Sequence, residues 1–157
     1  MEGESRKIKV SLTEDQPVEE GVRGSLQNFI SGLAVPQKVE LASKGNSEVR
    51  QILSRDPNKM VARAVILSPR LSMNDVAAYA ASPLTNEEVL RAIGEDREWM
   101  SHPSLVKAIV SNPKTPVPVA MRHLVHLSPA ELKLLSRNRN IHAVISREAK
   151  RLTLHRR

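Results

Sequence analysis

Residues 103–121 read PSLVKAIVSNPKTPVPVAM, and this stretch is where the fold can be predicted most directly. Four apolar residues recur with the spacing of one helical face: Leu105, Val106, Ile109 and Val110. The pair Asn112-Pro113 then interrupts the pattern, and a second apolar segment follows it. The stretch therefore predicts two short helices joined by a turn.

The same kind of turn recurs along the chain. A Pro residue preceded by a polar or His residue separates apolar segments at six places: Asp56-Pro57, Ser68-Pro69, Ser82-Pro83, His102-Pro103, Asn112-Pro113 and Ser128-Pro129. Taken in pairs, the intervals from Pro57 to Pro83 and from Pro83 to Pro113 are 26 and 30 residues. Pro fits the first turn of a helix, and the residue before it can cap that helix. A period of this length that contains two short helices indicates an array of repeats.

Local sequence also predicts where several helices begin. Ser128–Glu131 and Thr85–Glu88 match the capping box, and Ser72–Asp75 is a weaker version with Asp. The longest apolar stripe belongs to the last predicted helix: Ile141, Val144, Ile145, Ala149 and Leu152. Because period-two alternation is rare in the chain, we expect an all-α protein.

Helices of about 8–12 residues are marginal alone, so each must bury its stripe against neighbours. We expect residues 25–152 to form a short-helix solenoid of about four helix pairs, and residues 25–157 to be a single helical repeat domain. A compact helical bundle is the alternative architecture. Residues 1–24 mix charge, Gly and Pro, and we expect a disordered or loosely attached arm there.

The motif Val110-Ser111-Asn112-Pro113-Lys114-Thr115-Pro116, followed by an apolar helix, resembles the leucine-rich repeat variant family. Residues 80–85 and 53–57 resemble it more weakly. The resemblance implies a right-handed stack of short helices, related to HEAT-like arrays. It implies no activity. The chain departs from the family in its longer, irregular period and in lacking the Cys ligands of the iron–sulfur cluster that some members hold.

Composition excludes several classes of function. The chain has 157 residues and no Cys, which excludes disulfide scaffolds, thiolate metal sites and Cys nucleophiles. No apolar run approaches the length of about 20 residues that crosses a bilayer. The first residues, Met1–Lys7, lack the apolar region of a signal peptide, so we expect a cytoplasmic protein.

Positive charge is concentrated in the last third of the chain. Residues 101–157 contain 11 Lys and Arg against only Glu131 and Glu148, whereas residues 1–100 are slightly acidic. Arg147, Lys150 and Arg151 fall on one face of the last helix, opposite its apolar stripe. Such a stripe can follow the phosphate backbone of DNA or RNA. A solvated cationic face near a helix C-terminus is the simpler interpretation.

The function that we expect first is protein binding by a non-enzymatic module that presents an extended helical-repeat surface. The candidate contacts for a protein or nucleic-acid partner are basic residues in the loops and in the C-terminal third: Arg70, Lys114, Lys133, Arg137, Arg139, Arg147, Lys150 and Arg151. Nucleic-acid binding through the basic third is the alternative. With three aromatic residues in the whole chain, a platform for stacking bases is missing, so backbone contacts are the expected form.

Two residue groups could indicate chemistry, but neither has a supporting motif. His123 and His126 are three residues apart, as metal-binding pairs can be, yet further ligands are not evident. Asp96, Arg97 and Trp99 could form a base-excision site like that of some HEAT-like repair enzymes. Packing is the ordinary role of such residues. We therefore expect no catalytic residue, metal or cofactor. Oligomeric state is left open.

Overall fold

The computed structural model describes residues 11–156, which are helical and contain no strand. The prediction of an all-α protein is confirmed. The α-helices of this range are α1 (Glu20–Ser31), α2 (Val35–Lys44), α3 (Ser47–Leu53), α4 (Lys59–Ile66), α5 (Met73–Ala81), α6 (Glu87–Glu95), α7 (Pro103–Ser111), α8 (Val117–His123), α9 (Pro129–Ser136) and α10 (Ala143–His155). Two single-turn 3₁₀ helices, η1 (Trp99–Ser101) and η2 (Leu124–His126), lie between them.

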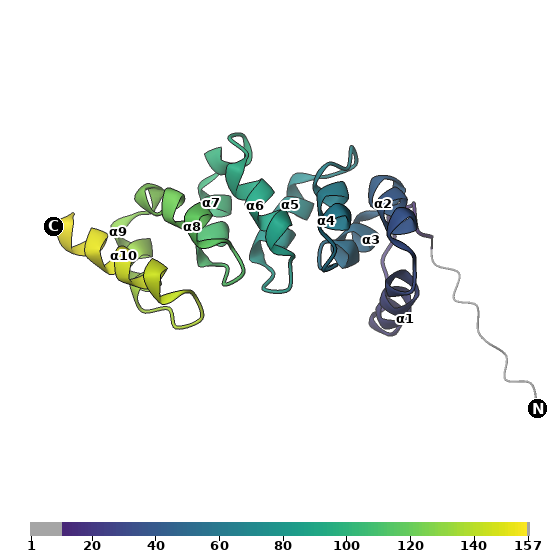
Figure 1. Cartoon of the computed structure of the whole chain (residues 1–157), viewed down its shortest axis with the longest axis horizontal. Helices are drawn as coiled ribbons and strands as arrows, with labels where there is room; N and C mark the ends of the chain where they lie inside the picture. The colour runs from purple at the N-terminus through teal and green to yellow at the C-terminus, as the bar shows by residue number, and fades with distance from the viewer. Residues whose placement is uncertain (1–10, 157) are drawn as a thin grey trace, which may run out of the picture.

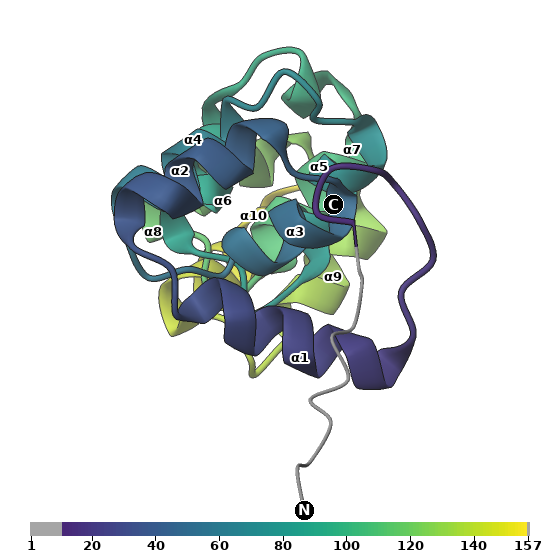
Figure 2. The ribbon, with the colours of Figure 1, turned by 90° about the vertical axis from the view of Figure 1, so that its right-hand side faces the viewer.

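The helices lie in a row along the longest axis of the molecule, in chain order (Figure 1). Even-numbered helices pack on one another in sequence, from α2 against α4 through to α8 against α10. Odd-numbered helices do the same from α1 to α7, whereas α9 packs mainly on α10. Seen along the row, α2, α4, α6 and α8 gather on one side and α5, α7 and α9 on the other (Figure 2). Counted in chain order, the ten helices of the described residues make five consecutive pairs, against about four predicted; in the first of these, α1 and α2 pack on α3 rather than on each other.

The apolar stripes meet in two buried clusters. The larger runs from Leu26 on α1 to Val119 on α8, and the smaller joins α7 and α8 to α9 and α10. Helix α7 contributes to both, because Leu105 and Ile109 face the larger cluster while Val106 and Val110 face the smaller. In each pair of adjacent apolar residues on α7, one side chain therefore packs into the larger cluster and the next into the smaller.

Two of the three predicted capping boxes form. The side chains of Ser72 and Ser128 each accept a hydrogen bond from the backbone N–H three residues on. In turn, the carboxylates of Asp75 and Glu131 accept one from the backbone N–H of Ser72 and Ser128. The prediction that Thr85 caps the next helix was wrong. Asn86 caps α6, whereas Thr85 is fully buried and donates its hydroxyl hydrogen bond to the Tyr79 carbonyl at 2.7 Å.

The Pro residues mark turns more often than helix starts. Only α7 and α9 begin directly at their Pro, at positions 103 and 129. After Pro69, Pro83 and Pro113 the next helix begins four residues later. The residue before Pro there closes a small turn with its own side chain, which delays the helix.

The N-terminal boundary also differs from the prediction. Helix α1 begins at Glu20, five residues before the expected start at Ser25. Residues 11–15 are attached to the helical row, since Asn46 Nδ2 donates to the carbonyls of Ser11 and Glu14 at 2.9 and 2.8 Å. The remainder of the predicted arm, residues 1–10, lies outside the described residues.

Candidate interaction site

Four loops within the helix pairs form one continuous edge of the row. They comprise residues 54–58, 82–86, 112–116 and 137–142, and we call them the loop edge. The last three of these loops hang from the lower side of the molecule in Figure 1. Asn86 joins the first two loops, because its backbone N–H donates to Ser54 O and its Nδ2 to Asp56 O.

The second and third loops are also joined by an Asn side chain. Asn112 Nδ2 donates to Ala80 O at 2.8 Å and to Ser82 O at 2.9 Å. Thr115 donates to Ile109 O at 2.7 Å, repeating 30 residues later the bond of Thr85 to Tyr79. These equivalent contacts show that the helix pairs of α5–α6 and α7–α8 share one loop design.

Each loop also closes a turn on itself. Side-chain oxygens accept the backbone N–H two residues on in all four loops: Asp56 from Asn58, Ser82 from Leu84, Asn112 from Lys114 and Asn138 from Asn140. Such turns fix the backbone and satisfy its polar groups. The backbone of the loop edge is therefore held in one conformation.

A hollow of about 460 Å³ lies on the loop edge. Residues from four consecutive helix pairs line it: Arg55, Pro57, Asn86, Glu87, Pro113, Lys114 and His142. A second hollow shares Arg55 and continues between α1, α3 and α5. A third is lined by Arg137, Arg139 and the first turn of α10. The third contains Ile141 and Ala143, the sequence neighbours of His142 in the first hollow. We call the three hollows together the loop groove.

The charge of the loop groove comes from side chains. Every loop joins the C-terminal end of one helix to the N-terminal end of the next, so the helix dipoles offset one another there. Arg55, Lys114, Arg137 and Arg139 are exposed and form no ion pair with another described residue. Asp56 is neutralised by Lys38, whose Nζ lies 2.7 Å from its carboxylate. The groove is therefore basic.

The structure thus brings three of the predicted contact residues, Lys114, Arg137 and Arg139, onto one edge. Arg147 and Lys150 lie on α10, exposed and unpaired within residues 11–156, and Lys133 lies exposed on α9. As predicted, Ile145 and Ala149 of α10 are buried on the opposite face.

Arg70 lies apart from these residues, and its guanidinium group forms hydrogen bonds within the fold. It follows α4 in the turn before α5, and its Nη1 donates to Thr13 O, Lys44 O and Gly45 O at 2.6, 2.8 and 3.1 Å. Two of these carbonyls belong to the end of α2, where a cation is favoured by the helix dipole. Arg70 therefore attaches residues 11–15 and closes α2.

Arg151 is also engaged. Its Nε lies 2.9 Å from Glu148 Oε2 in a two-point ion pair one turn away on α10. The hydrogen bond and the charge of Arg151 hold the pKa of the exposed Glu148 carboxyl below its ordinary value. Of the predicted stripe on α10, only Arg147 and Lys150 remain without a counter-charge among the described residues.

His123 and Arg156 bind backbone carbonyls at the end of α6 and in the segment that follows α8. His123 is buried on α8 and its Nε2 lies 2.6 Å from the Gly94 carbonyl of α6. Arg156 donates to Val125 O and Leu127 O at 2.8 and 2.9 Å. His123 thus has a structural contact, and no group of three or more His, Asp or Glu residues within 11–156 is placed to hold a metal ion.

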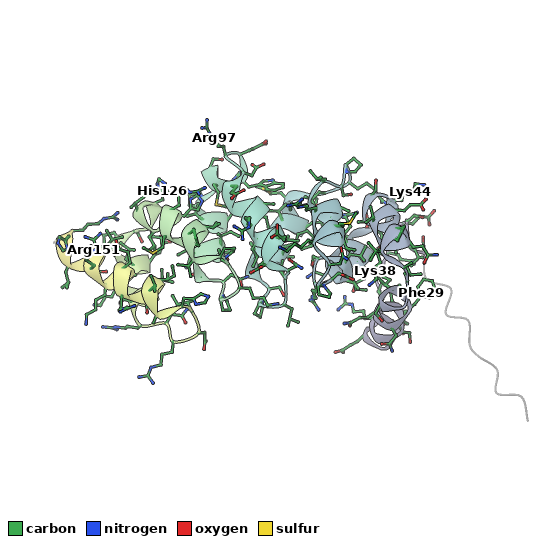
Figure 3. The ribbon with its side chains drawn as sticks, in the orientation of Figure 1. Phe29, Lys38, Lys44, Arg97, His126 and Arg151 are labelled. Carbon is green, nitrogen blue, oxygen red and sulfur yellow. The ribbon has the colours of Figure 1, made fainter. Side chains whose placement is uncertain are left out.

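The Asp96, Arg97 and Trp99 group forms a local turn. Asp96 Oδ1 accepts the backbone N–H of Trp99 at 2.9 Å, and the partly buried Trp99 packs against the larger cluster. Arg97 points outward from the upper side, opposite the loop edge (Figure 3). These contacts are those of a structural corner.

Arg55, Asn86 and His142 of the loop groove were not among the predicted contact residues. Arg55 and Asn86 lie within three residues of a predicted turn, at Pro57 and Pro83, whereas no predicted turn lies near His142. Only the folded row shows that turns 26–30 residues apart line the same hollow.

No family model, curated protein or solved structure matches this chain. The similarity to the leucine-rich repeat variant family therefore stays a prediction. Within residues 11–156, every helix is too short or too polar to cross a membrane.

Proposed function

We propose that this protein is a non-enzymatic interaction module that holds a segment of a partner protein in the loop groove. We interpret the five helix pairs as a short-helix solenoid, in which each pair buries its apolar stripes against the next. The observation that supports this function is the hollow on the loop edge, to which four consecutive pairs contribute residues. A partner seated there contacts several repeats at once.

The polarity of the site favours binding over catalysis. The turns of the loop edge use their Asp, Asn and Ser side chains to fix their own backbone, so these groups are occupied. The free groups are long cationic side chains, with His142 and Glu87 beside them. Cations of this kind recognise charge and position a partner.

Site-specific photo-crosslinking tests this function. A photoreactive residue would replace Lys114 on the loop edge or, as the matched control, Arg97 on the opposite side (Figure 3). We expect a defined protein adduct from position 114 in the native host, and none from position 97. Adducts of equal yield from both positions, or from position 97 alone, would contradict the proposal.

A second candidate function is contact with a nucleic-acid backbone by the C-terminal pair. Arg137, Arg139, Arg147 and Lys150 are exposed there, and no described acidic residue pairs with them. Titration of labelled duplex DNA and structured RNA between about 50 and 200 mM salt tests it, since phosphate contacts give a steep salt dependence. Binding that is unchanged in an Arg147→Glu, Lys150→Glu variant would exclude this surface.

A further inference from the structure

We infer that the segment bound in the loop groove is an extended acidic peptide whose Asp or Glu residues are spaced by multiples of three positions. This inference rests on the proposed function and specifies the chemistry of the partner. Three features of the groove lead to it: its charge, its satisfied backbone and the spacing of its repeats.

The charge selects an acidic partner. Arg55, Lys114 and Arg139 come from three different helix pairs, and each is exposed without a counter-ion among the described residues. Of the acidic residues near them, Asp56 is paired with Lys38 and Glu48 with Arg23, which leaves Glu87 at the rim. Complementary charge across an interface steers association and selects among partners.

Backbone groups of the loops already have hydrogen-bond partners, so a bound peptide must be recognised by side chains. The turns at Asp56, Asn112 and Asn138 already occupy the loop N–H groups that an added strand would need. Asn86 and Asn112 occupy loop carbonyls of the preceding pair. A peptide therefore cannot dock by strand addition here, and its carboxylates must meet the Arg and Lys side chains.

The spacing selects an extended conformation. Neighbouring packed helices lie about 8–10 Å apart, so equivalent side chains of successive pairs repeat at that distance. Three residues of an extended or polyproline-like chain span about 9–10 Å. Arg55 and Lys114 are two pairs apart, and Lys114 and Arg139 lie on neighbouring pairs. Acidic residues six and then three positions apart therefore meet these cations, and the position between the first two, which faces Glu87, need not be acidic.

The same features disfavour a nucleic acid in this groove. Single strands are held by bases stacked on aromatic rings, and the groove residues include none. Tyr79 is fully buried in the core, and Phe29 lies on α1 but does not line the groove (Figure 3). A hollow of about 460 Å³ accommodates the side chains of one narrow chain.

Selection from a random library of 12-residue peptides displayed on phage, on the immobilised full chain, tests the inference. We expect enriched peptides with Asp or Glu residues three or six positions apart. As synthetic labelled peptides, they should bind at least tenfold more weakly to an Arg55→Glu, Lys114→Glu, Arg139→Glu variant. The matched control, Arg63→Glu, Arg97→Glu, Arg122→Glu, changes net charge equally through exposed residues outside the groove. It should bind within twofold of the parent.

The outcomes separate the inference from the proposed function. Enriched neutral or basic peptides that lose binding in the groove variant would overturn the acidic partner and retain the interaction module. Peptides that bind both variants alike, or no enrichment at all, would overturn both. Labelled single-stranded RNA and duplex DNA form a further arm. Nucleic acid that binds through Arg55, Lys114 and Arg139 when acidic peptides do not would overturn the inference in favour of a phosphate backbone. Circular dichroism confirms that each variant is folded.

Discussion

At the scale of single residues, long-range polar contacts join one helix pair to the next. Asn86, Asn112 and His123 each reach a backbone carbonyl 29–32 residues earlier in the chain. Because a buried carbonyl without a partner costs free energy, each contact favours one alignment of neighbouring pairs. These contacts therefore fix the alignment of the helix pairs that line the loop groove.

Replacing Asn112 should separate the contribution of hydrogen bonds between helix pairs from that of the hydrogen bond within the turn. Asn112→Ala removes two bonds to the preceding pair and one within the turn, and we expect a loss of about 2–4 kcal/mol in the free energy of unfolding. Asn138→Ala removes only the equivalent turn bond and should cost about 1 kcal/mol or less. Urea unfolding measures both. Equal losses would show that the bonds between pairs contribute nothing.

Gly94 permits the close approach of α8 to α6. A Cβ atom at this position would clash with Val119 Cγ1, so the Val119 side chain or the helices must shift. We expect Gly94→Ala to reduce the free energy of unfolding by about 1–3 kcal/mol. At Gly24 in α1 the added methyl meets no atom within 4 Å, so Gly24→Ala should be neutral or stabilising by up to about 1 kcal/mol. Stabilisation by both substitutions would contradict the packing.

Residue roles were predictable only where the partner is close in sequence. The capping boxes of Ser72 and Ser128 depend on residues three positions away, and the sequence shows both partners. Arg70 was expected to face a partner protein, but its acceptors lie 25–57 residues away in the chain. Its role follows from the folded row alone.

At the scale of elements, a buried ion pair links α3 to α5. Arg50 Nη2 lies 2.8 Å from Asp75 Oδ2, and both side chains are almost fully buried. Burial acts to raise the pKa of the Asp75 carboxyl. Hydrogen bonds from Ser47 and Ser72, with the Arg50 guanidinium, outweigh that effect and hold its pKa below the ordinary value. Burial likewise raises the pKa of the neighbouring Tyr79 hydroxyl, which stays protonated.

The lowered pKa predicts a pH-dependent contribution to stability. Ionised Asp75 stabilises the fold above about pH 4, where the unfolded carboxyl titrates, and this is lost as pH falls through the lower folded pKa. At pH 7, Asp75→Asn should cost about 3–5 kcal/mol, because Arg50 stays buried without its counter-charge.

Urea unfolding of both proteins from pH 7 to pH 3 measures this contribution. The difference between them should shrink below about pH 4. Ser47→Ala, which removes a single bond to Asp75, is the milder variant if Asp75→Asn does not fold. A difference that stays constant across the range would exclude the ionised pair as its source.

Helix positions were predicted better than helix starts. Apolar spacing identified the buried faces of α6 and α7 correctly, since one stripe decides burial. At α10 only Ile145 and Ala149 of the predicted stripe are buried, and Val144 is exposed. The starts after Pro69, Pro83 and Pro113 were shifted, because the residue before each Pro closes a turn first. A sequence cannot easily distinguish a Ser or Asn that caps a helix from one that closes a turn.

At the scale of the whole molecule, order in the row determines which side chains meet. The charge asymmetry of the sequence suggested a basic C-terminal third, yet the loop groove also uses Arg55 from the second pair. Pairing with Glu148 and with backbone carbonyls removes Arg151, Arg70 and Arg156 from the surface available to a partner. Net charge along the chain therefore did not predict the site, which depends on the stacking of the pairs.

The most direct test of the central claim is a titration of the ¹⁵N-labelled full chain with a synthetic acidic 12-residue peptide, followed by amide chemical shifts. We predict that the shift changes concentrate in residues 54–58, 82–87, 112–116 and 137–143, in four loops that are distant in sequence but line one groove. Changes confined to the opposite turns around residues 67–72 and 96–102, or none at saturating peptide, would contradict the loop groove as the binding surface.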